Sequence, residues 1–224
     1  MIDFCVLGSG VSGSTIANIL SKKYSVHVFD KARGPGGRSS NKRFKNNLSF
    51  DHGVQYISPK SKIFTKYIKK LYKNKILKTW DENHLDFTFE KKTFSSKYIG
   101  KKANNDFIKY NLKNVKKSFS SLITKVSFNK YFWEITLKDK SKYQFKSLIL
   151  TCPFPQLKKL AKKYLDKKIL KLNVQMQPNI TVMIALKNQE SLPISSIKFN
   201  DDILAWAANE NSKNRFKSNI NLWT

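Results

Sequence analysis

The chain has 224 residues, a hydrophobic fraction of 40% and a formal net charge of +28. This length suits one large domain or two small ones, and the apolar content is sufficient for a packed core. Only four of the 43 basic residues are arginines, the lysines are spread over every segment, and no RNP-like or zinc-finger pattern is present. We therefore expect no specific nucleic-acid partner.

Cysteine usage and the apolar runs exclude further classes of protein. Cys5 and Cys152 lie in apolar runs without metal-binding or redox spacing, which argues against a disulfide scaffold and for a reducing, cytoplasmic compartment. The N-terminus lacks a basic region before its apolar stretch, so no secretory signal peptide is expected. No apolar run reaches about 18 residues, so no membrane span is expected.

The first thirty residues predict a β-α-β unit. Residues 2–7 (IDFCVL) form a short apolar run that ends at Gly8, which is typical of a buried strand. Residues 12–23 predict a helix, and residues 25–29 (SVHVF) predict a second strand that ends at Asp30. Such a unit implies two parallel strands joined by a right-handed crossover.

The remaining elements follow in chain order. Hydrophobic periodicity predicts helices over residues 61–75, 104–117 and 156–170. Alternating patterns predict short strands over 85–99, three strands joined by tight turns within 122–150, and strands over 180–186, 203–207 and the closing NINLWT. The alternation of predicted strands and helices, with the β-α-β unit first, indicates the α/β fold class. The closing run has no cap or turn after it, so we expect a cut there.

Residues 8–13 (GSGVSG) have the G-x-G-x-x-G spacing of a dinucleotide-binding loop and lie between the first predicted strand and helix. Gly8 permits the tight turn, Gly10 lets the backbone approach a pyrophosphate, and Gly13 lets the helix pack closely on the strand. The helix N-terminus adds free N–H groups and a partial positive charge. Asp30 lies 22 residues after Gly8, near the spacing expected of a carboxylate that binds the adenosine ribose. NAD and FAD share this loop.

The segment that follows favours FAD. Residues 31–43 read KARGPGGRSSNKR, and the glycine pair followed by Arg38 resembles the R-x-G-G-R motif of FAD enzymes in the flavin amine-oxidase superfamily. Gly36 and Gly37 can let the chain pass close to the cofactor, and Arg38 can offer its donor fork to a phosphate. Arg33 and Arg43 are candidate helpers, and surface solvation is the alternative for all three arginines.

The chain resembles the renalase-like branch of that superfamily more closely. The resemblance is carried, in the family's order and over nearly the whole chain, by FDKARGPGGR (29–38), FDHGVQY (50–56), LILTCPFPQL (148–157) and DDILAWAANENSKNR (201–215). Many flavin amine oxidases share the first stretch, whereas the second and fourth point to renalase-like proteins. The resemblance implies a Rossmann-like FAD-binding domain over 1–60 and 116–155, made of the β-α-β unit and the three-stranded β-meander. It implies an interleaved α+β substrate domain over 61–115 and 156–224.

The same resemblance implies the site residues. Tyr56 would contact substrate and flavin as the candidate catalytic residue, with a half-buried strand tyrosine as the alternative, and Val126 would contact the adenine through its backbone. LTCPFP would lie near the flavin edge, and Trp206 would face the substrate cavity or lie in the core. The implied cofactor-binding residues are Gly8, Gly10, Val11, Ser12, Gly13, Asp30, Lys31, Gly36, Gly37, Arg38, Ser39, Gly53, Gln55, Tyr56 and Val126.

The resemblance implies FAD as cofactor and a small amine or dihydropyridine-type hydride donor as substrate. The hydride would pass to flavin N5, and molecular oxygen or another acceptor would take the electrons. Such chemistry needs little from side chains, which suits a chain without a visible Ser-His-Asp or metal cluster; His52 is not expected to act as a base.

Members of the family continue beyond the end of this chain with a part that returns to the FAD domain. We therefore expect a half-built flavin-ring site, weak FAD retention and little activity for the chain as given. Three alternatives stay open: another flavin amine oxidase or desaturase, an inactive nucleotide-binding fragment, and a lysine-driven anion-binding protein. A simple NAD dehydrogenase is disfavoured because GPGGR has no role in one.

Overall fold

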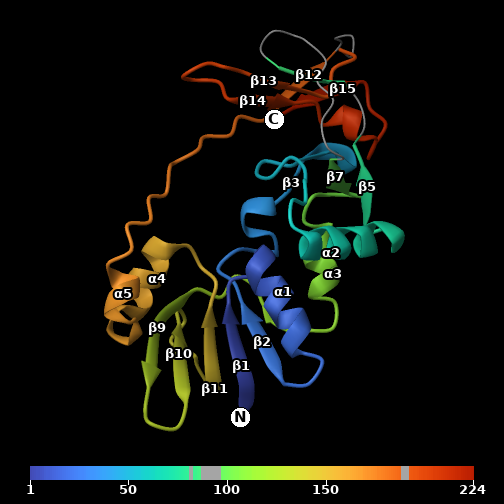
Figure 1. The fold of residues 1–224 in the computed structure, drawn as a ribbon. Helices are drawn as coiled ribbons and strands as arrows, with labels where there is room; N and C mark the ends of the chain where they lie inside the picture. The colour runs from blue at the N-terminus through green and yellow to red at the C-terminus, as the bar shows by residue number, and fades with distance from the viewer. Residues whose placement is uncertain (81–82, 87–96, 188–191) are drawn as a thin grey trace. The chain divides into compact units, whose positions relative to one another are not determined.

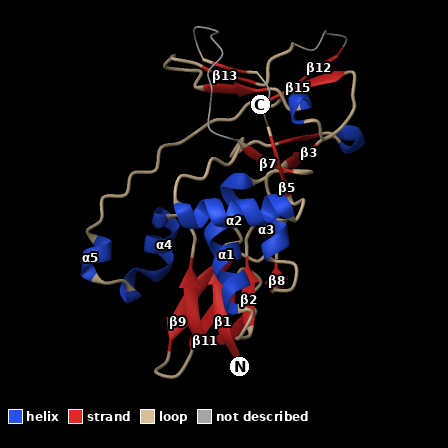
Figure 2. Cartoon of the chain, turned by 45° about the vertical axis from the view of Figure 1, so that its right-hand side comes forward, coloured by secondary structure: helices blue, strands red, loops and turns tan. Residues whose placement is uncertain are grey.

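The computed structural model describes residues 1–80, 83–86, 97–187 and 192–224, and the chain divides into two compact units (Figures 1 and 2). Unit 1 comprises Met1–Gly37 and Ile108–Asn179, and unit 2 comprises Arg38–Phe107 and Ile180–Thr224. Residues 38–60 thus belong to unit 2 and residues 156–179 to unit 1. The assignment of chain segments to a cofactor domain and a substrate domain stays a prediction.

Unit 1 is built around a six-stranded sheet in the order β8-β2-β1-β11-β10-β9. Its strands are β1 (Ile2–Leu7), β2 (Val26–Phe29), β8 (Lys116–Ser118), β9 (Ile123–Phe128), β10 (Trp133–Leu137) and β11 (Lys142–Leu150). β1 pairs in parallel with β2 and β11, whereas β10 is antiparallel to β9 and β11. With α1 (Val11–Leu20) between β1 and β2, the predicted Rossmann-like α/β fold class is confirmed.

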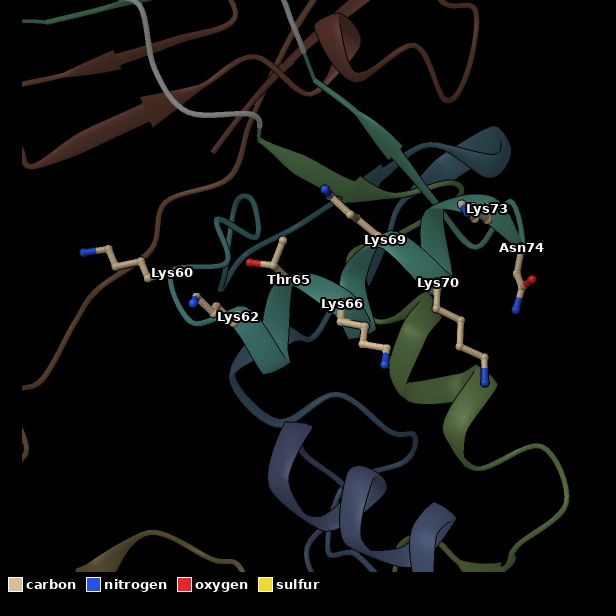
Figure 3. A pocket seen from close by; sticks show the side chains of 8 residues that line it. All are labelled: Lys60, Lys62, Thr65, Lys66, Lys69, Lys70, Lys73 and Asn74. Carbon is tan, nitrogen blue, oxygen red and sulfur yellow. The ribbon is translucent and has the colours of Figure 1, made fainter.

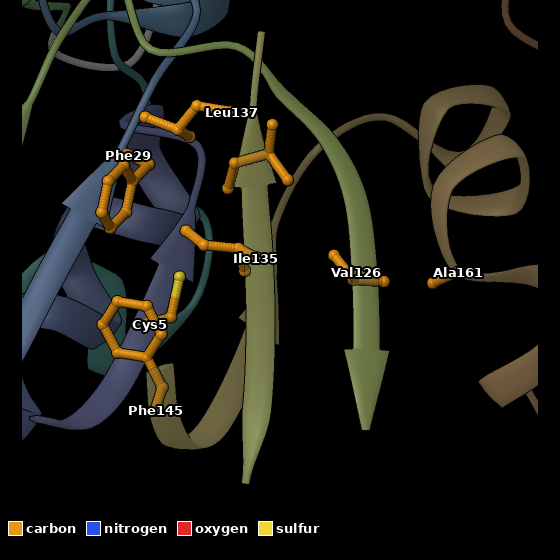
Figure 4. Close-up of a cluster of buried hydrophobic side chains, with 8 residues drawn as sticks. Cys5, Phe29, Val126, Ile135, Leu137, Phe145 and Ala161 are labelled. Carbon is orange, nitrogen blue, oxygen red and sulfur yellow. The ribbon is translucent and has the colours of Figure 1, made fainter. Parts of the chain in front are cut away.

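The core of unit 1 lies on the face of the sheet that α4 (Phe154–Ala161) covers (Figure 4). Its buried members are Cys5, Phe29, Ile123, Val126, Ile135, Leu137, Phe145 and Ala161. Successive strand side chains point to opposite faces, so the fully buried Val6 and Val28 point away from this cluster. Helix α1 packs against β1 and β2. Cover on both faces explains why β1 and β2 are apolar at most positions, with Asp3 and His27 as the exceptions.

One predicted helix is wrong over about half its length. The helix expected over 104–117 is α3 (Asp106–Asn111), and the chain then enters β8. β8 forms because Lys116–Ser118 pairs with β2 at the edge of the sheet. That pairing is a long-range contact, which local helical periodicity does not report. The helix expected over 156–170 is divided into α4, a 3₁₀ turn and α5 (Lys167–Leu170).

Unit 2 combines short strands with one longer helix. A three-stranded sheet has the order β14-β13-β6, formed by Trp206–Ala208, Ser196–Lys198 and His84–Leu85. Two-stranded sheets pair β12 (Ile184–Lys187) with β15 (Ile220–Trp223), β3 (Lys42–Arg43) with β4 (Ser49–Phe50), and β5 (Leu77–Thr79) with β7 (Tyr98–Gly100). The strand expected at 203–207 thus begins three residues later, and most of the expected 85–99 strands lie outside the described residues.

Helix α2 (Lys62–Lys73) follows the predicted helix at 61–75 closely. It begins after Ser61, whose side-chain oxygen accepts a hydrogen bond from the backbone N–H of Phe64 at 3.3 Å, as an N-cap serine does. Its buried residues are Ile68 and Leu71, three residues apart and so on one face. Within the described ranges, no helix has the length and apolar character needed to cross a bilayer.

His27 on β2 makes the stability of unit 1 depend on pH. Its ring is buried against Phe29 and Phe145, and its Nε2 lies 2.8 Å from Oγ of Ser118. Burial, and secondarily the charge of Lys116, lowers the pKa of His27 from 6.5 to about 4. The unfolded chain therefore takes up a proton at a pH where the folded chain does not. We predict that the free energy of unfolding falls by on the order of 1–3 kcal/mol between about pH 6.5 and pH 4.

Urea unfolding at pH 7 and at pH 4.5 measures this change. A His27→Gln variant is less stable at both values because it loses ring packing, but it lacks the titrating group. Its loss of stability on acidification should be smaller than that of the unmodified chain. Equal losses in the two chains would contradict the assignment to His27.

Candidate dinucleotide-binding site

The loop between β1 and α1 turns sharply at Gly8, which has a φ of +105° that side-chain-bearing residues rarely adopt. A Cβ at Gly13 would lie 1.9 Å from the carbonyl oxygen of Gly8 and 2.8 Å from Oγ1 of Thr151. Helix α1 therefore approaches the end of β1 only because residue 13 has no side chain. Thr151 stabilises the same turn, since its hydroxyl donates to the carbonyl oxygen of Leu7 at 2.8 Å.

The N-terminus of α1 is open to an anion. Gly10 is the N-cap residue, no side chain caps the helix, and the first turn contains no acidic residue. The first N–H groups of a helix have no acceptor within it, so those of Val11, Ser12 and Gly13 are available, and the helix dipole adds partial positive charge. Val11 and Ser12 are both exposed. This arrangement suits a phosphate group.

The second glycine-rich loop returns to the first. The N–H of Gly36 donates to the carbonyl oxygen of Ser9 at 3.2 Å. Gly37 has a φ of +53°, and a Cβ on it would lie 3.1 Å from Cα of Gly10. The two loops therefore present bare backbone to each other within unit 1. Lys31, at the start of the second loop, is exposed.

Asp30 lies at the carboxyl end of β2 and shapes the first loop. Its Oδ2 accepts hydrogen bonds from the backbone N–H of Ser9 at 2.7 Å and from the Ser9 hydroxyl at 2.5 Å. Its Oδ1 accepts from the N–H of Ala32 at 2.8 Å. A carboxylate oxygen can accept two hydrogen bonds, so Oδ1 has a further lone pair that a ribose hydroxyl can use.

Taken together, these features fit the adenosine and pyrophosphate part of a dinucleotide. The bare glycine backbone, the open helix N-terminus and the carboxylate after the second strand are all present in unit 1. A family model described as an NAD(P)-binding Rossmann-like domain matches residues 6–72, which include both loops and Asp30. The chain contains a Rossmann-like dinucleotide-binding segment.

Several solved structures are similar in fold to the whole chain. A protein from Exiguobacterium sp. 255-15 named as a protoporphyrinogen oxidase gives a TM-score of 0.71 at 10% identity, with 99% of this chain and 76% of that chain covered. A protein from Pyrococcus furiosus gives 0.70 at 12% identity, with coverage of 99% and 78%. Putrescine oxidase bound to putrescine gives 0.66 at 9% identity, with coverage of 99% and 74%.

The predicted cofactor residues beyond Gly37 lie in unit 2, apart from Val126. The side chain of Arg38 is exposed and Ser39 is buried. The N–H of Val54 donates to the carbonyl oxygen of Arg38 at 2.9 Å. A Cβ on Gly53 would lie 2.1 Å from that same oxygen, so only glycine allows these two segments to meet. Val126 is buried on β9, an edge strand of the sheet in unit 1.

Tyr56 lies half-buried in an aromatic cluster of unit 2. Its ring centroid is 5.8 Å from that of Trp206 and 6.5 Å from that of Trp80. Nζ of Lys97 lies 5.3 Å from the centre of the Tyr56 ring, and burial lowers the pKa of Lys97 to about 8. The structure thus brings Tyr56 and Trp206 together, and the roles expected of them toward a substrate stay predictions.

A buried cluster of charges in unit 2 was not predicted from the sequence. The side chains of Asp51, Glu210, Lys213 and Arg215 are at most 2% exposed. Nζ of Lys213 donates to Oδ2 of Asp51 at 3.0 Å and to Oε2 of Glu210 at 2.9 Å, and Arg215 pairs with the same Asp51 oxygen. Burial raises the pKa of Asp51, but the charges of Lys213 and Arg215 outweigh this and keep it below its ordinary value.

The charged cluster also fixes the backbone around Gln55. Lys213 donates to Oε1 of Gln55 at 2.9 Å, and the Gln55 amide donates to the carbonyl oxygen of Asp51. Nδ2 of Asn104 donates to the carbonyl oxygens of Val54 and Gln55 at 2.7 Å each. The stretches FDHGVQY and ENSKNR are therefore joined by buried ion pairs. Asp51 directly after the apolar strand residue Phe50 is the signal that the sequence offered.

We predict that Gly13→Ala destabilises unit 1 by about 1–3 kcal/mol, because the new methyl group overlaps a backbone carbonyl oxygen. Gly34→Ala is the matched control, since a Cβ there would meet nothing within 4 Å and should change stability by less than about 0.5 kcal/mol. Thermal unfolding of both variants compares them. Equal shifts in midpoint temperature would contradict the close approach of α1 to β1.

Lys213→Met removes one of the two cations from the buried cluster. Two carboxylates and Arg215 then remain, and the cluster has a net negative charge. Because that charge has no access to water, we predict a loss of about 3–5 kcal/mol in the free energy of unfolding. Lys217→Met is the matched control, since Lys217 is exposed and should be neutral within about 0.5 kcal/mol. A Lys213 variant as stable as the Lys217 variant in urea would show that the cluster contributes nothing.

Proposed function

We propose that the protein is an FAD-dependent oxidoreductase of the flavin amine-oxidase type. The observation that supports this best is the contact between the two glycine-rich loops, in which Gly36 and Gly37 meet Ser9 and Gly10 beside the open N-terminus of α1. The first loop alone serves NAD as well as FAD. The second loop, followed directly by Arg38, has a use in an FAD site and none in a simple NAD dehydrogenase.

Residues of this chain would hold the cofactor. The N–H groups of Val11, Ser12 and Gly13 would bind the pyrophosphate, and Oδ1 of Asp30 would accept from a ribose hydroxyl. Arg38 would place its exposed guanidinium on a phosphate oxygen, with Lys31 adding charge and Ser39 a donor. Val126 would contact the adenine, and Gly53, Gln55 and Tyr56 would approach the isoalloxazine ring.

Bound FAD would supply the N5 atom that accepts a hydride, and with it the redox chemistry. The chain would orient the donor and exclude water, for which Tyr56 and Trp206 are our candidates because their rings lie together. We propose a small amine or a dihydropyridine-type compound as the donor and molecular oxygen as the electron acceptor. Two cysteines, both free thiols in the structure, agree with a cytoplasmic location.

The renalase-like branch is the more specific proposal. The two stretches that favour it, FDHGVQY and ENSKNR, are the two that Asp51, Glu210, Lys213 and Arg215 join through buried ion pairs. The alternative is another flavin amine oxidase or desaturase, and the fold shared with putrescine oxidase favours an amine as donor in that case. Anaerobic loss of oxidised flavin absorbance with a dihydropyridine donor, or with putrescine, distinguishes the two.

Titration with FAD and with NAD⁺, followed by protein fluorescence, tests the cofactor proposal. We predict that FAD binds at least about tenfold more tightly than NAD⁺, and that Arg38→Ala weakens FAD binding by about tenfold through loss of a charge-assisted hydrogen bond. Lys45→Ala, which removes another exposed cation of unit 2, should leave FAD binding within about twofold. Preference for NAD⁺, or equal effects of the two substitutions, would contradict the proposal.

A further inference from the structure

The exposed face of α2 carries a continuous stripe of lysines (Figure 3). The lysine stripe consists of Lys62, Lys66, Lys69, Lys70 and Lys73, all of them exposed. At 3.6 residues per turn these five positions fall within about 100° of the helix circumference and extend along about 16 Å of its length. Together with Lys60, Thr65 and Asn74, they line a hollow of about 670 Å³.

No carboxylate of the described residues balances this stripe. Residues 52–80 contain eight lysines and no aspartate or glutamate. The ion pairs in the described part of the chain involve other residues. Like charges one turn apart on a helix destabilise it. The sequence had indicated an even spread of lysines, but α2 gathers five of them on one face, and no carboxylate of the described residues pairs with them.

We propose that the lysine stripe docks the protein on a membrane surface that carries anionic lipid headgroups. The apolar residues Ile68 and Leu71 of α2 are buried in unit 2, so the helix would lie on the headgroups and not insert. The ammonium group of lysine is a strongly hydrated point charge. It suits diffuse attraction to lipid phosphates, which raises the membrane partition constant by about fivefold for each lysine near the surface. The proposal is independent of the cofactor.

One apolar side chain favours lipid over nucleic acid as the partner. Ile63 lies beside Lys62 at the start of α2 and is 87% exposed. Transfer of an isoleucine side chain from water to the boundary between headgroups and acyl chains lowers the free energy. A nucleic-acid phosphate backbone offers no such apolar site. Helix α2 contains no arginine, the side chain that most often reads bases. Its exposed aromatic residue, Tyr72, packs edge-on against Tyr98 with the ring centroids 5.8 Å apart.

Sedimentation with vesicles of phosphatidylcholine, with and without phosphatidylserine, tests the proposal on the full chain. The stripe variant replaces the five lysines of the stripe by glutamine. The control variant makes the same change at five exposed lysines spread over unit 1, namely Lys22, Lys23, Lys113, Lys125 and Lys138. Both variants lose the same charge, so their difference separates the stripe from the attraction of any chain with a net charge of +28.

We expect the unmodified chain to bind phosphatidylserine vesicles and not phosphatidylcholine alone. The stripe variant should bind at least about 100-fold more weakly, and the control variant should lose less than about tenfold. Equal losses in the two variants, or no binding of the unmodified chain, would overturn the proposal. Glutamine keeps the helix propensity of lysine, and far-ultraviolet circular dichroism of each variant checks that the helical content of the chain is unchanged.

Ile63→Ser is the second variant. Because Ile63 is exposed, the substitution should leave the stability of the fold unchanged. It should weaken vesicle binding by about tenfold, as loss of a buried isoleucine side chain requires, and should leave binding to duplex RNA unchanged. Stronger binding to RNA than to anionic vesicles, lost in the stripe variant and unaffected by Ile63→Ser, would assign the stripe to nucleic acid and refute the lipid proposal.

Discussion

The approach of α1 to the end of β1 is the constraint on which the nucleotide-binding half of the structure depends. At residue 13 even one methyl group would overlap the carbonyl oxygen of Gly8. Because the helix comes so close, its first N–H groups lie at the carboxyl end of the parallel strands, where ligands of such sheets bind. The contact of Gly37 with Gly10 then extends the same bare backbone surface with a second loop.

Unit 2 depends on a constraint of a different kind. Two carboxylates and two cations are buried together, and each makes hydrogen bonds that compensate for the loss of water. Such a cluster contributes less to stability than apolar packing would, but it tolerates few alternative arrangements. It joins residues 162 positions apart and determines where the backbone of Gln55 lies. The loop proposed to face the flavin is thus positioned by buried charges that need not touch the cofactor.

The accuracy of the sequence-based fold followed the range of the interactions involved. The β-α-β unit and the β-meander were predicted well, because buried strands with short connections leave local apolar patterns. The predicted helix at 104–117 was wrong in its second half, because Lys116–Ser118 is a strand only through its pairing with β2. β14 begins later than expected for a similar reason. Its residues Trp206–Ala208 pair with β13, a short strand that hydrophobic periodicity did not predict.

The candidate site divides in the same way. Spacing alone placed Gly8, Gly10, Gly13 and Asp30 around one loop, because a strand, a turn and a helix of known geometry leave few other arrangements. Thr151, directly after β11, contacts the same turn from 143 residues away, and the charged partners of Asp51 come from the far end of the sequence. The number of lysines was evident from the sequence, but the alignment of five of them on one face of α2 was not. Local chemistry was legible in the chain itself, whereas contacts between distant segments, and the faces they leave exposed, were decided only by folding.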